Sequence, residues 1–347
     1  MTLIVLLRGI VNHFGIGDHP GRHNQREFPF SRAGGLVLYI AIMVAMIANH
    51  SLRGNFLILL GCAALMMALG LFVERQRLSV PLRILIQASL VTIVIVGAYG
   101  SVTHIGAIFG PDILLGILSV PFSVIAFIGG INAIRMIDGE GGLAGKMALI
   151  TILGVTTICY LAGITKLPME LAMLGALFGF LLLNSRLLAK RPWVFMGDSG
   201  SMWLGLVLGW VMVQLTHDTV SAEPALALWL FGIPLLDTLA EMIRRLKYKR
   251  TPFNPDRTHI YHILEHRGIS VRNSVLILTL LHSVSVAIGV FFYLVYAPSF
   301  VVFWSFVLML GMYYYGLRNY DFSLREISML QNFSSVSFRL SDKNKDG

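Results

Sequence analysis

Long apolar stretches alternate with short polar connections along most of the chain. Ten of these stretches are long enough to cross a bilayer, which takes about 20 apolar residues in a helix. They cover residues 34–49, 55–73, 83–99, 114–134, 147–164, 170–185, 201–216, 224–240, 274–296 and 299–316. The pattern predicts an all-α integral membrane protein, a polytopic bundle of about 10 to 11 transmembrane helices with its functional loops on the cytoplasmic side.

The two ends of the chain depart from this pattern. Residues 1–14 are apolar but too few for a full crossing, so we expect a shortened or re-entrant first helix there, without the cleavage site of a signal peptide. Residues 318–347 are polar, which favours a flexible cytoplasmic tail. The chain is therefore expected to form a single transmembrane domain over residues 1–317, followed by the tail.

Charged residues lie mainly in the connections and indicate their sides. They make up 13% of the chain, against 56% hydrophobic residues, and the net charge is +9. One set of alternate connections holds 24 of the 27 lysines and arginines, and the other set holds only Arg53 and Lys166. Because cytoplasmic loops of membrane proteins are enriched in Lys and Arg, the first set is predicted to be cytoplasmic. Membrane orientation thus explains the basic charge, and no nucleic-acid partner is expected.

Two of the cytoplasmic connections combine acids with glycines. RMIDGEGG carries Asp138 and Glu140 in a loop whose glycines let the backbone approach a ligand closely. WVFMGDSGSMWLG places Asp198 at the start of an apolar helix, where a carboxylate and free backbone N–H groups suit a metal ion and a phosphate. The alternatives are a plain flexible loop in the first case and a helix N-cap by Asp198 or Ser199 in the second.

A third cytoplasmic connection, RTPFNPDRTHIYHILEHRG, is rich in histidine and arginine. His259 and His262 are one helical turn apart and Arg257 precedes them, which suits a cluster facing a phosphate. A zinc site is the alternative, but no thiol accompanies the histidines. Asp237 lies toward the cytoplasmic end of an apolar stretch, and an acid inside the membrane indicates function unless an arginine pairs with it.

The order and wording of these stretches resemble one family of membrane enzymes. FMGDSGS and PFNPDRTHIYH are similar to signatures of the polyprenyl-phosphate N-acetylhexosamine-1-phosphate transferases, of the glycosyltransferase 4 type. The closest branch starts O-antigen and enterobacterial common antigen chains. The resemblance runs from about residue 18 to about residue 272, and eleven helices, counting residues 1–14, also fit that family.

The resemblance implies a reaction at the cytoplasmic face of the bacterial inner membrane. Undecaprenyl phosphate attacks the β-phosphate of a UDP-N-acetylhexosamine, UMP leaves, and the lipid-linked product starts a cell-surface glycan. Mg²⁺ normally offsets the phosphate charge in such transfers. The implied partners are the nucleotide sugar, the lipid phosphate and the membrane lipids, and a second copy of the chain is a further candidate.

The resemblance also implies roles for individual residues. Asp198 matches the metal ligand of the family, and Asp138 matches a residue that helps to shape the metal and nucleotide site. The histidine cluster differs at its middle position, where this chain has Tyr261. The expected catalytic residues are Glu74, Asp138, His259 and His262. The expected substrate-binding residues are Asn132, Arg135, Arg77, Arg257, Asp237 and Gly197.

The sequence departs from the family at several acidic positions. In GLFVERQRLSVPLR, Val73 and Arg77 replace the first and third acids of the family's DDxxD motif, and Glu74 keeps a carboxylate at the second. In RMIDGEGGL, Arg135 replaces an asparagine and Gly141 replaces an acid. Two of the altered positions therefore carry an arginine, close to where the family neutralises phosphate charge with a metal.

Two hypotheses follow from these departures. The first is an active transferase with an altered phosphate-neutralising site. The second is a catalytically impaired paralogue that binds lipid phosphate or nucleotide sugar, or that partners an active transferase. Lost carboxylates weaken Mg²⁺ binding, whereas arginine grips phosphate directly, so a weakened or dispensable role for Mg²⁺ is expected. A transporter is less favoured because the sequence shows no inverted repeat.

Cysteine-accessibility labelling tests the predicted orientation. Cysteines introduced near Arg53, Lys166 and His217 are expected to react with a membrane-impermeant maleimide from the periplasm, because their connections lack the basic bias of the cytoplasmic set. Cysteines near Glu74 and Asp198 are expected to react only after the inner membrane is opened. Periplasmic labelling beside Asp198 would contradict the whole assignment of the site.

Overall fold

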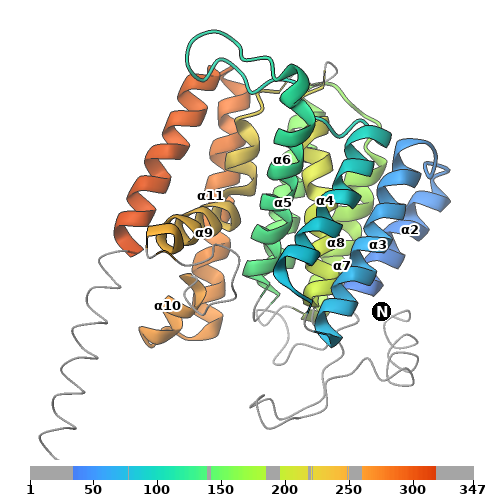
Figure 1. Cartoon of the computed structure of the whole chain (residues 1–347), viewed down its shortest axis with the longest axis horizontal. Helices are drawn as coiled ribbons and strands as arrows, with labels where there is room; N and C mark the ends of the chain where they lie inside the picture. Colours follow the sequence, from blue (N-terminus) through green and yellow to red (C-terminus); the bar gives the residue numbers. More distant parts are fainter. Residues whose placement is uncertain are drawn as a thin grey trace, which may run out of the picture. The chain divides into compact units, whose positions relative to one another are not determined.

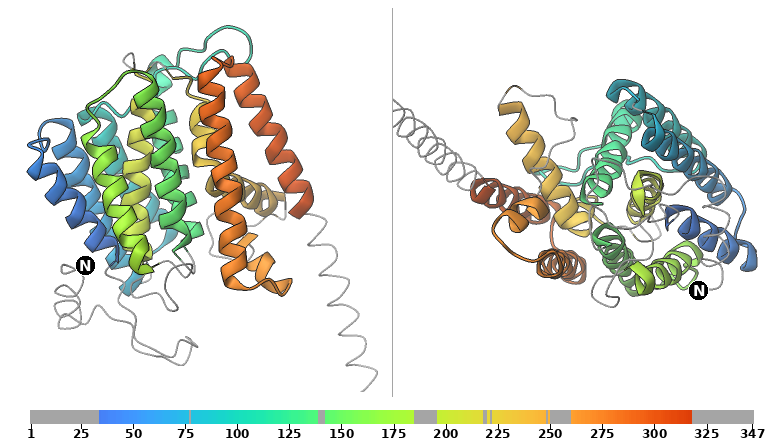
Figure 2. Two further views of the ribbon diagram at one scale, coloured as in Figure 1. Left: turned by 180° about the vertical axis from the view of Figure 1, so that it is seen from behind. Right: turned by 90° about the horizontal axis from the view of Figure 1, so that it is seen from below.

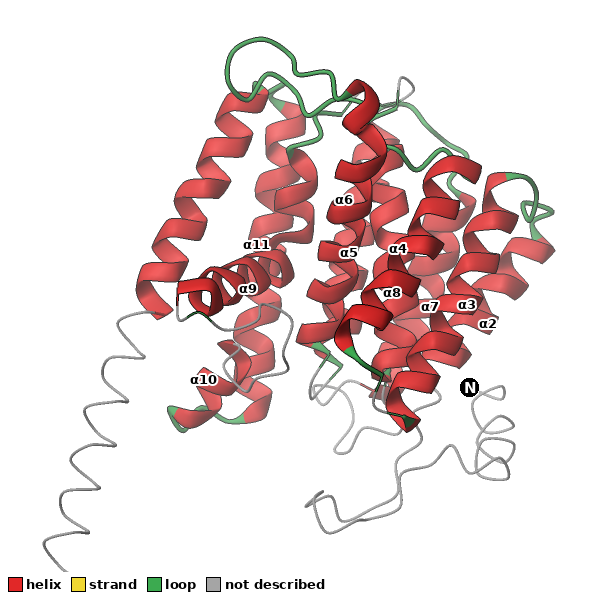
Figure 3. Cartoon of the chain, viewed as in Figure 1, coloured by secondary structure: helices red, strands yellow, loops and turns green. Residues whose placement is uncertain are grey.

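Helices make up almost all of the chain that can be described. The computed structural model describes residues 34–76, 78–138, 142–184, 196–217, 220, 222–247, 249 and 260–317, and these ranges contain no strand (Figures 1 and 3). The helices are α2 (Gly34–Ala48), α3 (Asn55–Arg75), α4 (Val80–Gly97), α5 (Ser119–Ile137), α6 (Leu143–Leu161), α7 (Pro168–Asn184), α8 (Gly197–Gln214), α9 (Leu226–Lys247), α10 (Ile260–His266) and α11 (Val271–Leu294), followed by a last helix, Ser299–Leu317.

Each of the ten predicted apolar stretches contains a helix, so the prediction of an all-α polytopic bundle is confirmed. Seven of the described helices are long and apolar enough to cross a membrane, and two shorter apolar helices accompany them. The protein is therefore a multi-pass membrane protein. The predictions for residues 1–14 and 318–347 fall outside the described residues. The chain divides into two compact units after Trp304, and everything described below lies in the first.

Successive helices alternate in direction, which gathers distant connections at one end of the first unit. Helices α3, α5 and α7 end where α4, α6 and α8 begin (Figure 1). We call this the site end, because it holds Glu74, Arg135, Asp138 and Asp198. At the opposite end, the α4–α5 connection is longer than predicted, since α5 begins only at Ser119 after a 3-10 turn over Gly116–Leu118.

Helix α8 lies in the middle of the bundle and has no face toward lipid. Figure 2 shows it end-on, inside a ring of other helices, and it contacts α2, α3, α5 and α6. Every residue from Ser199 to Val213 is buried. Such a helix needs no lipid-facing apolar stripe, because its neighbours supply its surroundings. It can therefore carry polar residues in its first turn and four glycines along its length.

Glycines bring α8 into backbone contact with α2 and α3. A Cβ added at Gly35 in α2 would lie 2.3 Å from the Cα of Gly200, and one added at Gly70 in α3 would lie 2.4 Å from the Cα of Ser199. Small residues allow this close approach between helices, which replaces the hydrophobic effect as a source of association inside a membrane. The indole of Trp203 adds a hydrogen bond of 3.2 Å to the carbonyl of Gly35.

Helix α9 is broken near its middle, and side chains of other helices satisfy the freed backbone. Gly232 has φ 44°, and Pro234 has no N–H to donate to the carbonyl of Leu230. The hydroxyl of Thr151 donates to that carbonyl at 2.8 Å, and the hydroxyl of Ser285 donates to the carbonyl of Trp229 at 2.9 Å. Without water, backbone groups must find such partners inside the protein.

The contact between Gly70 and the first turn of α8 predicts that no residue larger than glycine fits at position 70 without a loss of stability. Gly70→Ala is expected to lower the free energy of unfolding by about 1–3 kcal/mol, the usual range for overpacking, because its Cβ meets backbone atoms that cannot rotate away. Thermal unfolding in detergent, followed by tryptophan fluorescence, measures the loss.

Gly61 provides the matched control on the same helix, since a Cβ there has nothing within 4 Å. Gly61→Ala is expected to change the unfolding free energy by less than about 1 kcal/mol. Equal effects of the two substitutions would show that the close approach of α3 and α8 is not a packing constraint.

Candidate active site

The site is built around the first turn of α8. Gly197 has φ 72°, a left-handed conformation that favours glycine, and Met196 is the N-cap residue without a side-chain capping bond. The alternative that Asp198 or Ser199 caps the helix is therefore wrong, because both residues lie inside its first turn. Backbone N–H groups at this end have no partner within the helix and carry a partial positive charge, which attracts acids from elsewhere.

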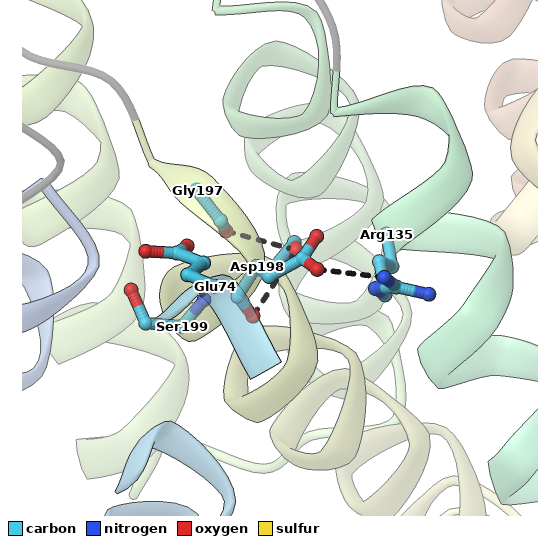
Figure 4. A network of polar contacts seen from close by, with 6 residues as sticks. Glu74, Arg135, Gly197, Asp198 and Ser199 are labelled. Atoms are coloured by element: carbon cyan, nitrogen blue, oxygen red, sulfur yellow. Dashed lines mark hydrogen bonds and ion pairs between the residues drawn. The ribbon is translucent and has the colours of Figure 1, made fainter. Parts of the chain in front are cut away.

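Two charged side chains reach this turn from different helices. Glu74, at the end of α3, accepts a hydrogen bond of 3.2 Å from the backbone N–H of Ser199. Arg135, in the last turn of α5, donates to the carboxylate of Asp198 at 2.6 Å. Figure 4 shows the two side chains approaching the turn from opposite sides. Both arrive from helices that end at the site end, so residues far apart in sequence form one polar cluster.

Asp138 is the third acid of this cluster and lies directly after α5. Desolvation raises its pKa well above the ordinary value of 3.8, and the charges of Asp198 and Glu74 raise it further. A backbone hydrogen bond from Gly197 acts in the opposite direction and is outweighed. Three acids therefore converge on the start of α8, and mutual repulsion favours the protonated form of Asp138.

Arg83 belongs to the same cluster, although the sequence indicated only that it is one of the 24 basic residues of the cytoplasmic connections. It lies in the first turn of α4, is 7% exposed, and is close enough to Arg135 and Asp198 for their charges to act on it. Its Nε finds no hydrogen-bond acceptor among the described residues. Gln87, one turn later, is fully buried. Polar residues at i and i+4 inside an apolar stretch were the sequence signal that could have identified this face of α4.

Comparison with known proteins places this cluster in a family. Residues 56–216 match the family described as glycosyl transferase family 4. The chain is also 30% identical over 319 residues to the undecaprenyl-phosphate alpha-N-acetylglucosaminyl 1-phosphate transferase of Salmonella typhi, an alignment that covers 91% of this chain and 87% of the relative. The chain belongs to glycosyl transferase family 4.

Other relatives carry the same name as the Salmonella protein. That of Escherichia coli strain K12 is 30% identical over 90% of this chain and 86% of its own length, and that of Yersinia pestis is 29% identical over 92% and 88%. The resemblance noted in the sequence is therefore confirmed. Glu74, Arg135, Asp138 and Asp198 all lie in the part of the chain that matches the family 4 description.

The remaining predicted residues of this family 4 protein fall into two groups. Asn132 is 3% exposed, and its amide donates at 2.8 Å to the carbonyl of Ile128 in its own helix. Asp237 is buried in α9 and accepts a hydrogen bond of 3.2 Å from the backbone N–H of Ile260, which fastens the start of α10. Arg77, Arg257, His259 and the side chain of His262 lie outside the described residues.

The described residues do not fit the magnesium ion that the resemblance implied. Among them, no group of three or more His, Cys, Asp and Glu side chains is arranged to hold a metal. Arg135 already binds one oxygen of Asp198, and Glu74 faces the N–H of Ser199. Proteins usually bind Mg²⁺ through one or two carboxylates together with waters and substrate phosphates, and a guanidinium already paired with Asp198 opposes this. We therefore assign no step of the chemistry to a metal.

The raised pKa of Asp138 predicts how stability depends on pH. Because ionisation is less favourable in the folded protein than in the unfolded chain, the stability linked to the protonated acid is full below about pH 3.8 and is lost as the pH rises through the raised pKa. Relative to Asp138→Asn, which cannot ionise, the native protein is expected to lose thermal stability progressively as the pH rises above about 3.8.

Thermal unfolding of both proteins across that range measures the difference. The asparagine can still accept the backbone hydrogen bond, so the variant is expected to fold. A constant difference between the two proteins at every pH would contradict the assigned shift.

Proposed function

We propose that this family 4 protein transfers an N-acetylhexosamine-1-phosphate unit from a UDP-sugar to undecaprenyl phosphate. The reaction takes place at the cytoplasmic face of the bacterial inner membrane and releases UMP. Support for the two substrates comes from the relatives, whose name contains both undecaprenyl phosphate and an N-acetylglucosaminyl 1-phosphate unit. Support for the cytoplasmic face comes from the basic residues that accumulate in the connections of the site end.

The observation that carries the proposal is the mixed-charge cluster at the start of α8. Arg135 and Arg83 offer positive charge, and Asp138, Asp198 and Glu74 hold these groups and the helix terminus in one place. Phosphoryl transfer needs little covalent help from a protein and depends on positioning and on offsetting negative charge. A cluster at the end of a membrane bundle suits a reaction between a lipid phosphate and a water-soluble nucleotide sugar.

The chemistry makes one bond and breaks one bond at the same phosphorus. An oxygen of undecaprenyl phosphate bonds to the β-phosphorus of the UDP-sugar. The bond from that phosphorus to the oxygen bridging the α-phosphate breaks, and UMP leaves with the electron pair. The guanidiniums of Arg135 and Arg83 stabilise the charge that shifts toward the leaving group. The raised pKa of Asp138 makes its ionised form a stronger base, which can accept a proton from the attacking phosphate when that oxygen is protonated.

The predicted histidine segment completes the proposal. Arg257, His259 and His262 keep their expected role of contacting the phosphates or the sugar. Asp237 supports this role, because its carboxylate accepts a hydrogen bond from the backbone N–H of Ile260, which lies between His259 and His262. Tyr261 is buried, and its hydroxyl donates to Glu265 at 3.0 Å, so its side chain is occupied in stabilising α10.

A second candidate function is that of a non-catalytic paralogue. Val73 and Gly141 lack the acids that the family has there, and Arg135 pairs with the one acid that matches a metal ligand. A protein with these features can still bind a lipid phosphate or a nucleotide sugar. Turnover separates the two candidates, because only the first releases UMP.

A transfer assay with the purified protein in nanodiscs tests the proposed function. Undecaprenyl phosphate and UDP-N-acetylglucosamine are incubated with and without Mg²⁺, with UDP-N-acetylgalactosamine in parallel, and both UMP and the lipid-linked product are quantified. Release of UMP that matches lipid product is expected. Asp198→Asn is expected to lower the rate roughly 100-fold, because it removes the charge that positions Arg135.

Asp112→Asn is the matched control, since this exposed acid lies in the connection at the opposite end and pairs only weakly with His104 at 3.4 Å. It is expected to leave the rate unchanged. Absence of UMP release with every sugar, with and without Mg²⁺, would reject the transferase and favour the non-catalytic paralogue.

A further inference from the structure

The ion pair between Arg135 and Asp198 places a fixed positive group beside an acid that the family uses for a metal. Both side chains are partly accessible, at 19% and 28%, and the distance of 2.6 Å is that of a strong charge-assisted hydrogen bond. The pair lies in the first turn of α8, where the partial positive charge of the helix terminus also stabilises an anion. A ligand that reaches the start of α8 therefore meets a guanidinium as well as a carboxylate.

Arg83 provides a second and independent sign of a missing ligand. Its side chain is more than nine-tenths buried, and its Nε has no acceptor among the described residues. The Nε of Arg135 is also buried, and it too has no hydrogen-bond acceptor among the residues that the structure describes. Buried N–H groups are nearly always hydrogen-bonded, and leaving one unsatisfied is unfavourable. Two such donors beside one acid indicate that an acceptor of another molecule completes the site.

The neighbouring face of α4 supports the same conclusion. Gln87 lies one turn after Arg83 and is fully buried, yet neither atom of its amide has a hydrogen-bond partner among the described residues. Residues four apart share one face of a helix, so Arg83 and Gln87 line the same side of α4. This side carries more hydrogen-bonding capacity than the described protein uses.

We infer that Arg135, assisted by Arg83, replaces a divalent cation in this protein, so that the site binds a diphosphate group without metal. The inference rests on the proposed function and specifies how its anionic substrate is held. Two guanidiniums carry the charge of one divalent cation, and each presents its donors in a planar fork that matches phosphate oxygens. Asp198 then orients Arg135 as a positioning residue instead of coordinating an ion.

The inference makes metal binding and diphosphate binding independent of each other. Arginine remains attached to the protein and charged at every relevant pH, so diphosphate affinity does not follow the metal concentration. The same positive charge repels a cation from Asp198. Replacing Arg135 with the asparagine that the family has there removes both effects at once.

Binding measurements with inorganic pyrophosphate as the probe test the inference on the full chain in nanodiscs. For the native protein, the Kd for pyrophosphate is expected to differ by less than about 3-fold between EDTA and Mg²⁺. Arg135→Asn is expected to weaken binding in EDTA roughly 10-fold or more, since it removes a charge-assisted fork, and to bind Mn²⁺, detected by the loss of its free EPR signal. The native protein is expected to leave that signal unchanged.

Two further variants keep the result interpretable. Arg53→Asn makes the same change at an exposed arginine on the opposite end and is expected to behave as the native protein. Arg135→Lys keeps the charge without the fork and is expected to bind pyrophosphate in EDTA with intermediate affinity, which decides the matter if Arg135→Asn fails to fold.

Three outcomes would overturn the inference. They are native binding that collapses in EDTA, native binding that is absent under both conditions, and metal-free binding that neither substitution of Arg135 weakens. The proposed function fails separately. If the protein binds pyrophosphate in EDTA but releases no UMP, the inference stands and the transferase function is rejected. If it releases UMP only with Mg²⁺ and binds pyrophosphate only with Mg²⁺, the transferase function stands and the inference is rejected.

Discussion

The first turn of α8 lies against α2 and α3 with no side chain between the backbones, because glycines occupy the contact positions. Gly35 and Gly70 face Gly200 and Ser199 at distances that a Cβ would close to below 3 Å. This contact fixes where α8 begins relative to the end of α3, and hence where Glu74 meets the N–H of Ser199. The geometry of the polar cluster is thus a consequence of small residues that let the helix backbones approach closely.

Charge balance follows from that geometry. Three acids meet one helix terminus and two guanidiniums in a site that is partly shielded from water. Burial, and after it repulsion from Asp198 and Glu74, raises the pKa of Asp138, whereas the carboxylate of Asp198 is paired with Arg135. A cluster of this composition is held by the bundle around it, since neither the acids nor the arginines would gather here unaided. The Nε atoms of Arg83 and Arg135 remain without an acceptor among the described residues, and the anionic ligand that we propose would supply one.

The break in α9 also depends on contacts between helices, because other helices must supply hydrogen bonds to the backbone carbonyls that it leaves unpaired. Gly232 and Pro234 interrupt the helix inside the bundle. Hydroxyl groups from α6 and α11 donate hydrogen bonds to the carbonyls that the break leaves without a partner in the helix. The second part of α9 can then depart from the direction of the first part and carry Asp237 to the start of α10 (Figure 1). Irregular backbone is tolerated at membrane depth only with such support.

The sequence by itself determined the helices, the end of the bundle that carries the chemistry and the family. Apolar length decides which segments are helical in a membrane, and motifs such as FMGDSGS are local, so neither needs knowledge of packing. The tertiary structure alone decided which charges meet. Arg135 and Asp198 are 63 residues apart, and Glu74 and Ser199 are 125 apart, so their pairing depends on helix rotation and on the glycine contacts of α8. Arg83 looked like one membrane anchor among many for the same reason, because burial of a guanidinium is a property of the assembled helices.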